Sequence, residues 1–419
     1  MHHHYRIPGR IELVGKHVDY AGGRSITCAV DLAITAEARA LAAPVLRVQD
    51  SQRPEVVELA LNDDCTAAAG HWSVYAAAVV RRLCRDFPGI RTGVDLRLQS
   101  TLPESAGLSS SSAFVVAVAT AVVEANGLPA TERWLEAIPT TLARAEYFGA
   151  METGAPFGPF AGDLGVGVRG GAQDPVAILC AQEGHCGVFS YLPATLHEYV
   201  PWPKQQVLVV AVSGVEATKT GNARAQYNRV ADSMRALASA ASATKMTSGG
   251  NTTHQSSEVG TATVAALLAQ GNRAFLEGIA AKGLPDFPGD YLLPRFEQFC
   301  EEVGTVVPAV AAALAAGDLE ALGQWVDRSQ ALATAGLRNQ VPETIALQRS
   351  ARELGAAAAS AFGAGFGGAV WAMVAADSAE EFRKRWGQQY LAAFPSHAAK
   401  FRSFITRPGP GATAVESQP

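Results

Sequence analysis

A cluster of four serines beside a glycine is the feature of this sequence best suited to chemistry. Gly107, Leu108 and Ser109–Ser112 run directly into the apolar stretch Ala113–Val118, so that a flexible loop feeds a buried helix. Free backbone N–H groups and the positive end of the helix dipole converge at such a start and bind anions. Serine hydroxyls at its mouth can also ligate a hard cation such as Mg2+. Helix capping explains one serine but not four, so the pattern predicts an enzyme that handles phosphate.

Two further glycine-rich segments, residues 9–20 and 363–368, flank this loop in the sequence. The order and wording of all three segments resemble the GHMP kinases, and within them the galactokinases. In that family the first segment reads Pro-Gly-Arg, a short apolar stretch, then Gly-Glu-His-x-Asp-Tyr-x-x-Gly-Gly, and Pro8–Gly23 follows it closely. Weaker family patterns match Trp72–Tyr75 and Leu322–Ser329 with Val341–Glu343. The resemblance therefore spans nearly the whole chain.

The resemblance implies a two-domain α+β GHMP kinase fold with the active site between the domains. The N-terminal domain would be ribosomal protein S5 domain 2-like and the C-terminal domain ferredoxin-like. The implied activity is that of an ATP-dependent sugar 1-kinase, which phosphorylates the anomeric hydroxyl of galactose or a closely related sugar and uses Mg2+. A mevalonate kinase fits less well, because the sugar motif and the late pattern belong to the galactokinase side. A catalytically silent sensor that binds sugar and ATP is the alternative of another class.

On the nucleotide side, the resemblance assigns phosphate binding to the serine loop and to the third glycine-rich segment. The residues so assigned are Gly107, Leu108, Ser109, Ser110, Ser111, Ser112, Gly365 and Gly367. Trp72 would line the adenine pocket, and Ser111 and Glu146 would be the Mg2+ ligands. Glu146 can equally be a solvated glutamate at a helix end, because the stretch from it to Asp174 is longer than in the family.

Phosphoryl transfer requires positioning of the nucleotide, neutralisation of charge and preparation of the attacking hydroxyl. Asp174 falls where galactokinases place their catalytic aspartate, in a Gly-x-Met-Asp-Gln context, and would be the general base. Gln173 and Pro175 depart from that context, and Asp before Pro also makes a good helix start, so Asp163 is the fallback. Arg10 would stabilise the transferring phosphoryl group, or would only form a salt bridge across the domain interface.

The resemblance also implies sugar-binding positions. They are Lys16, His17, Asp19, Gly171 and Tyr227. Lys16 stands where the family has a glutamate, and a lysine reverses both the charge and the hydrogen-bond polarity. Two explanations stay open. Lys16 could pair with a carboxylate at the sixth carbon, making this a uronic acid (galacturonate or glucuronate) 1-kinase, or it could neutralise Glu12, which replaces the family's usual asparagine.

The elements that position these residues follow from the apolar pattern. It predicts strands at Ile26–Ala38, Val45–Leu61 and Gly93–Leu98 and helices at Ser73–Phe87, Ser111–Asn126 and Ala130–Phe148. A break at Pro201–Pro203 indicates an N-terminal domain over 1–200, a C-terminal domain over 201–407 and a disordered tail over 408–419. Gly165–Gly170 has the spacing of a dinucleotide fingerprint but follows no buried strand, so we reject NAD binding.

Composition limits the remaining possibilities. With 419 residues, 48% hydrophobic and 17% charged, the chain can bury the cores of two domains. A net charge of -5 without a basic cluster gives no reason to expect nucleic acid or an anionic membrane as partner. The apolar run Ala113–Val123 is too short to span a bilayer, and the six cysteines lack metal-site spacing. We expect a cytoplasmic protein with reduced thiols, either a monomer or a weak homodimer.

Overall fold

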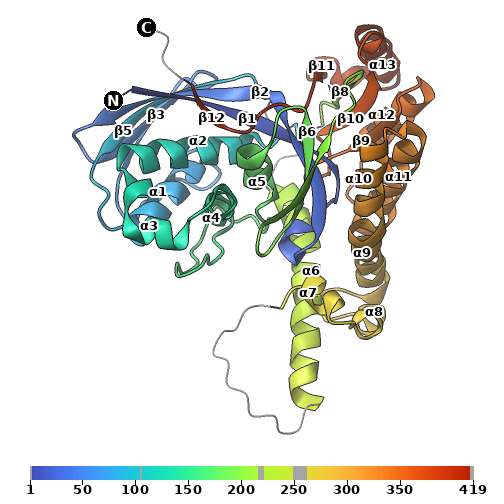
Figure 1. Cartoon of the computed structure of the whole chain (residues 1–419), viewed down its shortest axis with the longest axis horizontal. Coiled ribbons are helices and arrows are strands. Elements are labelled where there is room, and N and C mark those ends of the chain that lie inside the picture. The colour runs from blue at the N-terminus through green and yellow to red at the C-terminus, as the bar shows by residue number, and fades with distance from the viewer. Residues whose placement is uncertain (1, 104–105, 216–220, 249–261, 416–419) are drawn as a thin grey trace.

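The computed structural model describes residues 2–103, 106–215, 221–248 and 262–415. It contains an eight-stranded and a four-stranded sheet, each covered by helices (Figure 1). The second sheet begins after β7, so the chain changes sheets close to residue 201, where the sequence breaks at Pro201–Pro203.

The first sheet has the strand order β12-β1-β2-β5-β3-β4, and β6 and β7 extend it along β2. Its strands are β1 (His2–Val14), β2 (Arg24–Leu41), β3 (Val45–Asp50), β4 (Val56–Ala60), β5 (Gly93–Ser100), β6 (His185–Ser190), β7 (Thr195–Pro201) and β12 (Thr413–Val415). The register of β1 on β2 shifts between Pro8 and Arg10 and again between Glu12 and Val14. Such irregularities bend a strand and redirect its side chains, here on either side of Arg10 and Glu12.

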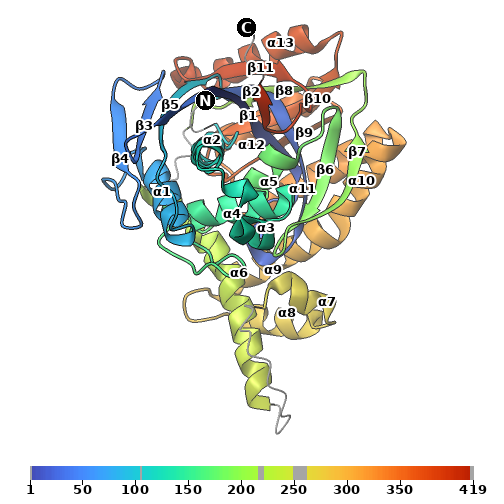
Figure 2. The same cartoon turned by 60° about the vertical axis from the view of Figure 1, so that its left-hand side comes forward.

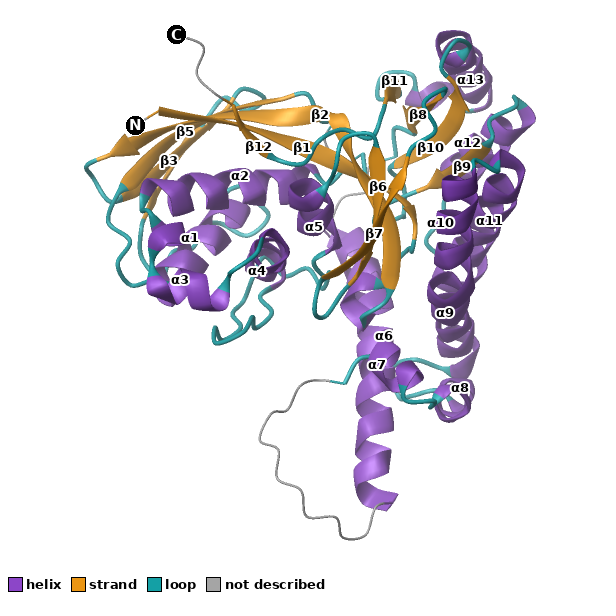
Figure 3. Ribbon diagram, viewed as in Figure 1, coloured by secondary structure: helices purple, strands orange, loops and turns teal. Residues whose placement is uncertain are grey.

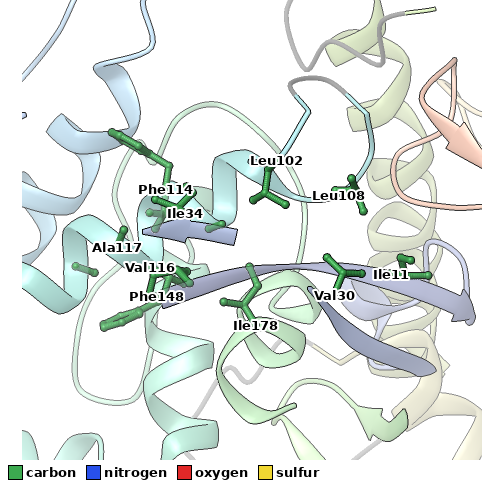
Figure 4. Close-up of a cluster of buried hydrophobic side chains, with 14 of the residues drawn as sticks. Ile11, Val30, Ile34, Leu102, Leu108, Phe114, Val116, Ala117, Phe148 and Ile178 are labelled. Carbon is green, nitrogen blue, oxygen red and sulfur yellow. The ribbon is translucent and has the colours of Figure 1, made fainter. Parts of the chain in front are cut away.

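Five helices cover one face of the first sheet (Figure 3). They are α1 (Val74–Asp86), α2 (Ser110–Ala125), α3 (Glu132–Ala137), α4 (Thr141–Thr153) and α5 (Gln173–Cys180). α2 is apolar on nearly all sides because it lies in the middle of this layer, and its Phe114 and Val116 pack near Ile34 of β2 (Figure 4). The helix that carries the serine loop is therefore fixed by the core.

The second sheet has the order β11-β8-β10-β9. Its strands are β8 (Gln206–Val212), β9 (Ala358–Ala361), β10 (Ala369–Ala375) and β11 (Arg402–Thr406). Its helices are α10 (Val307–Ala316), α11 (Leu319–Leu332), α12 (Pro342–Glu353) and α13 (Ala379–Ala393). β8 is a continuous apolar run because both its faces are covered. Val207 and Val209 belong to the cluster with α12 and α13, whereas Leu208 and Val210 belong to the cluster with α10 and α11.

Between β8 and α10 the described residues form four more helices. They are α6 (Gly221–Ser248), α7 (Val264–Ala269), α8 (Arg273–Lys282) and α9 (Gly289–Glu301). α6 runs away from both sheets and forms a projection with α7 and α8 (Figures 1 and 2). The continuous helix Gly289–Ala316 is long and apolar enough to cross a membrane by length and composition, but half of its most apolar window is buried inside the protein. That burial is typical of a core helix.

Short turns of 3-10 or π helix complete the fold. They are η1 (Asp19–Ala21), η2 (Leu128–Ala130), η3 (Glu302–Val306), η4 (Ala333–Leu337) and η5 (Pro395–His397). The predicted disordered tail is wrong for residues 408–415. Gly409 N donates to Ala29 O at 3.0 Å, and β12 pairs antiparallel with β1, so backbone hydrogen bonds hold this segment on the first sheet. Residues 416–419 lie outside the described part.

Candidate active site

The serine loop and the two glycine-rich segments meet at one place; residues 104 and 105, which precede the loop, lie outside the described residues. Arg10 N donates to Leu108 O at 3.1 Å, and Arg10 Nη1 donates to Gly107 O at 2.5 Å. A Cβ atom on Gly363 would lie 3.0 Å from Gly107 O, and both glycines have positive φ, 77° and 78°. Only glycine permits this conformation and this close approach. The segments therefore form one structural unit.

A cavity opens at this junction. Its wall consists of residues 10, 12, 17, 19, 20, 112, 152, 153, 168, 170, 171, 173, 174, 227, 363 and 364. A second cavity, lined by Trp72, Ser110 and Ser111 among others, shares Val168 with the first. At the start of α2, Ser112 therefore lines the first cavity, and Ser110 and Ser111 line the second. Two ligands, one in each cavity, could meet at the serine loop.

Arg10, which is buried, and Asp174, which is partly buried, form an ion pair in the first cavity. Arg10 Nε donates to Asp174 Oδ1 at 2.7 Å, and Arg10 Nη2 lies 2.6 Å from the same oxygen, with 5% and 17% of the two side chains exposed. Burial alone would lower the pKa of Arg10, but the carboxylates of Asp174 and Glu12 keep it above its usual value. Asp174 is the second residue of α5, whose N-cap is Ala172, so it does not cap the helix. The two predicted catalytic residues are therefore in direct contact.

Ser112 connects Asp174 to a carboxylate that sequence reasoning missed. Its hydroxyl donates to Glu152 Oε2 at 2.7 Å and lies 3.3 Å from Asp174 Oδ2. Glu146, the predicted metal ligand, instead accepts a hydrogen bond from Ala194 N at 3.3 Å, and burial raises its pKa. Six residues separate the two glutamates on α4, which turns them about 120° apart around the helix. The structure therefore brings Ser112 together with Glu152, whereas Glu146 is hydrogen-bonded to Ala194.

Trp72 lies on the second cavity, beside the start of α2. Its Nε1 donates to Glu55 Oε1 at 2.6 Å, its ring meets Phe114 edge-on at 5.7 Å between centroids, and the Arg53 guanidinium lies 5.2 Å above it. An aromatic face held in this way beside Ser110 and Ser111 suits a nucleotide base next to its phosphates.

The remaining residues assigned to phosphate binding support the loop rather than line either cavity. Leu108 is buried in the hydrophobic core. Gly365 and Gly367 have φ values of 79° and 131°, and a Cβ on them would lie 2.4 Å from Asn339 Nδ2 and 2.7 Å from Val215 O. Ser109, with φ of 59°, turns the chain into α2.

The predicted sugar residues other than Lys16 all lie on the first cavity. His17 Nε2 is 2.9 Å from Ala364 O, and the rings of His17 and Tyr227 are 5.3 Å apart. Asp19 approaches Gly171 so closely that a Cβ there would lie 2.6 Å from Asp19 Oδ2. Burial, followed by the Asp174 carboxylate, raises the pKa of Asp19. One wall of the cavity is therefore polar and tightly packed.

Lys16 points away from the cavity. It is 1% exposed, and its Nζ donates to Ser329 Oγ at 2.8 Å, while Ser329 Oγ donates to Glu302 Oε1 at 2.7 Å. Burial lowers the pKa of Lys16, against the carboxylates of Glu302 and Glu12, which raise it. Glu12 does line the cavity; burial raises its pKa to about 7, against the charges of Lys16 and Arg10. Lys16 is therefore compensated first by Glu302 and then by Glu12.

α9 and the turn after it support the sugar loop, residues 15–19, from behind, and no sequence motif predicted this support. Arg295 Nη2 donates to His17 O at 2.5 Å, and Gln298 Nε2 donates to Lys16 O at 3.2 Å. Gly15 N donates to Glu302 Oε1 at 2.7 Å. All three side chains are buried. The sequence does not distinguish these three residues, because Asp290, Glu297 and Glu301 of the same segment are also polar.

Asp163, the fallback base, lies outside the cavity. Its Oδ2 is 3.5 Å from Arg81 Nε, and its Oδ1 accepts a hydrogen bond from Gly165 N at 2.9 Å. The segment Gly165–Gly170 that follows contains no strand or helix, which agrees with the rejection of a dinucleotide fingerprint. Val168 and Gly170 of this segment line the first cavity instead.

Comparison with known proteins agrees with this geometry. The chain matches the GHMP kinases N terminal domain over residues 74–157, the GHMP kinases C terminal domain over 310–392 and the galactokinase galactose-binding signature over 2–40. The galactokinase of Pyrococcus furiosus is 26% identical over 407 residues, which is 96% of this chain and 97% of the relative. The structure of Lactococcus lactis galactokinase complexed with galactose superimposes with a TM-score of 0.78 at 22% identity, covering 99% of this chain and 95% of that one. The structure of Methanococcus jannaschii mevalonate kinase superimposes with a TM-score of 0.58 at 15% identity, covering 97% of this chain and 98% of that one.

Two domains of this fold and a cavity shared by three glycine-rich segments define a small-molecule kinase of the GHMP class. The chain belongs to the GHMP kinase superfamily and, within it, to the galactokinase-like sugar kinases.

Proposed function

We propose that this chain transfers the γ-phosphoryl group of ATP to the anomeric hydroxyl of galactose or a closely related neutral sugar. The observation that carries the proposal is the Arg10–Asp174 pair, which lies in a cavity adjoining the one that holds Trp72, Ser110 and Ser111. The sugar would occupy the first cavity and the nucleotide the second, with the γ-phosphate between them at Ser112.

In this arrangement Asp174 accepts the proton of the anomeric hydroxyl through Oδ2, because Arg10 occupies Oδ1. The freed oxygen attacks the γ-phosphorus as the bond to the bridging oxygen breaks, and ADP leaves with that electron pair. Arg10 keeps its positive charge at any working pH and lies beside the attacking oxygen, where it stabilises developing negative charge. Backbone N–H groups at the start of α2 hold the phosphates.

Ser112 and Glu152 are the residues that would hold Mg2+. A hydroxyl and a carboxylate are the hard oxygen ligands this ion prefers, and two protein ligands leave the other positions for phosphate oxygens and water. Among the described residues no group of three or more His, Cys, Asp or Glu side chains could hold a metal alone. When bound, Mg2+ neutralises charge on the β- and γ-phosphates.

A neutral sugar fits the cavity better than a uronic acid. Its wall carries the carboxylates of Glu12, Asp19, Glu152 and Asp174 against the guanidinium of Arg10, and Lys16 is directed elsewhere. A sugar carboxylate would meet like charge there. We also propose that the enzyme works in the cytoplasm as a monomer or weak homodimer, as its composition suggests.

ADP release on a panel of sugars tests the proposal. The wild type is expected to turn over galactose or a neutral relative, and Asp174→Ala to lose a factor of about 10² to 10⁴ in kcat. Asp377→Asn, an exposed aspartate in the turn after β10, is the matched control and should keep full activity. Sugar binding without ADP release by the wild type would instead support the sensor, and turnover of galacturonate but no neutral sugar would support the uronic acid kinase.

A further inference from the structure

Three positions at which this chain departs from the galactokinase pattern lie together. Glu12 stands for the family's asparagine, Gln173 for its methionine and Lys16 for its glutamate. Glu12 and Gln173 both line the first cavity, and Lys16 lies behind Glu12 and compensates its charge. Residues that depart from the family pattern and lie together in the structure indicate that they act on the same ligand group.

Glu12 and Gln173 each bury a polar atom that has no hydrogen bond. The two residues are 2% and 6% exposed, and within the described residues neither Glu12 Oε1 nor Gln173 Nε2 has a partner. Buried polar atoms in native proteins are nearly always paired, because an unpaired one bears the full cost of its desolvation. Two unpaired atoms on one cavity wall therefore point to a ligand group that completes them.

The two atoms are of opposite kinds. Glu12 Oε1 can accept a hydrogen bond and Gln173 Nε2 can donate one, and a weak hydrogen-bonding interaction with the Gln173 side chain acts to lower the pKa of Glu12. A sugar hydroxyl donates one hydrogen bond and accepts others, so a single hydroxyl can satisfy both. A carboxylate would be repelled by Glu12, and a methylene would leave both atoms unpaired.

The backbone places this pair beside the reacting groups. Glu12 follows Arg10 by two residues on β1, so the two side chains leave the strand on the same side. Gln173 directly precedes Asp174 at the start of α5. A hydroxyl held by Glu12 and Gln173 would therefore neighbour the one that Arg10 and Asp174 prepare for phosphorylation.

We propose that Glu12 and Gln173 form a specificity site that reads the C2 hydroxyl of the sugar, which donates to Glu12 Oε1 and accepts from Gln173 Nε2. Lys16, held by Ser329, is the positioning residue that lets a carboxylate be buried at this point. The inference rests on the proposed function, because it takes the phosphorylated position to be C1. The substrate class is then a neutral hexose with a free hydroxyl at C2.

The test compares galactose with its 2-deoxy, 4-deoxy and 6-deoxy analogues in the wild type, Gln173→Met, Glu12→Leu and Glu12→Gln. Sugar dissociation constants from calorimetry and kcat/KM from ADP release are both measured. The wild type is expected to prefer galactose over 2-deoxygalactose by about ten- to a hundredfold, the range for one hydrogen bond to a charged group. In Gln173→Met and Glu12→Leu that preference should fall toward one, while discrimination against the 4- and 6-deoxy sugars stays.

Glu12→Gln retains an acceptor and should keep most of the preference, and the exposed Glu380→Gln is the control that should change nothing. Gln173→Met removes no charge, so it keeps the test open if Glu12→Leu fails to fold. The inference is overturned if Gln173→Met keeps the wild-type preference for galactose over 2-deoxygalactose, or if it weakens binding of all four sugars equally. Binding ratios as expected without any turnover would overturn the proposed function alone, and a chain that binds none of the sugars overturns both.

Discussion

Buried charges determine what single side chains can do in this site. Arg10 is compensated by Asp174 and Lys16 by Glu302 through Ser329, whereas Glu12 Oε1 has no hydrogen-bond partner within the described residues. Removing one partner of a buried ion pair leaves an unpaired charge and is strongly destabilising. For this reason the activity of Asp174→Ala is compared with its free energy of unfolding, which separates a loss of catalysis from a loss of stability.

Glu12 should make the stability of the protein depend on pH. Burial raises its pKa from 4.5 to about 7, so between these values the folded state keeps a proton that the unfolded chain has released. Stability therefore falls as the pH rises through this window. Glu12→Gln cannot lose a proton at this position, so its stability should not show this fall. Relative to wild type, the free energy of unfolding of the variant should therefore rise by about 3 kcal/mol between about pH 5 and about pH 8.

Denaturant titrations of both proteins at the two pH values measure this shift. Glu353→Gln, which alters an exposed glutamate, provides the baseline for general effects of charge. A pH-independent difference between Glu12→Gln and wild type would show that Glu12 titrates normally and would remove the electrostatic reason for the buried Lys16.

The assignment of the Mg2+ ligands gives a second test of individual residues. Glu152→Gln should raise the Mg2+ concentration needed for half-maximal activity by about tenfold, because the amide lacks the negative charge that the ion requires. Glu146→Gln, on the same helix, should leave it unchanged. Mg2+ titrations of ADP release measure both, and the reverse pattern would restore Glu146 as the ligand.

Among the elements, α9 is the support on which the sugar loop depends. Arg295→Met removes the hydrogen bonds to His17 O and to Tyr20 Oη, the latter at 3.2 Å, and leaves a buried carbonyl unpaired. We expect a loss of about 3 kcal/mol in stability and a KM for the sugar that rises more than kcat falls. Arg328→Met breaks an exposed ion pair with Glu301 and should cost less than about 1 kcal/mol. Equal effects of the two variants would show that α9 does not position the loop.

Element types could be predicted from the sequence, but not all of their divisions. The expected helix Ser73–Phe87 corresponds to α1, Val74–Asp86. The expected helix Ala130–Phe148 is instead α3 and α4, because the chain breaks at Ile138–Pro139 and Thr140 caps the new helix by accepting from Ala143 N at 3.1 Å. The expected strand Val45–Leu61 is β3 and β4, divided by a turn that contains Pro54.

The site was predictable where a motif fixes the backbone and not where distant packing decides. The glycine-rich segments around Arg10 and Gly107 set their own backbone conformation. The serine loop and the Arg10–Asp174 pair could therefore be predicted from the sequence. The role of Glu152 could not be predicted. Only the packing of α4 against α2 determines that Glu152, and not Glu146, faces Ser112. The direction of Lys16 depends on Ser329, 313 residues away in sequence.

Over the whole molecule, the account depends on the return of distant segments to one junction. The serine loop, residues 107–112, and the glycine-rich segments 9–20 and 363–368 meet where the two sheets with their helices adjoin (Figure 1). β12 adds to this by pairing the end of the chain with β1, the strand that carries Arg10 and Glu12. Placing the junction between domains allows a cavity for each substrate.

The position of phosphate on the product tests the central claim most directly. After incubation of the wild type with ATP, Mg2+ and galactose, phosphorus–proton correlated NMR of the product should show the phosphate on the anomeric oxygen, with one ADP formed for each sugar phosphate. Phosphate at any other carbon, or ADP release that does not depend on sugar, would contradict the account.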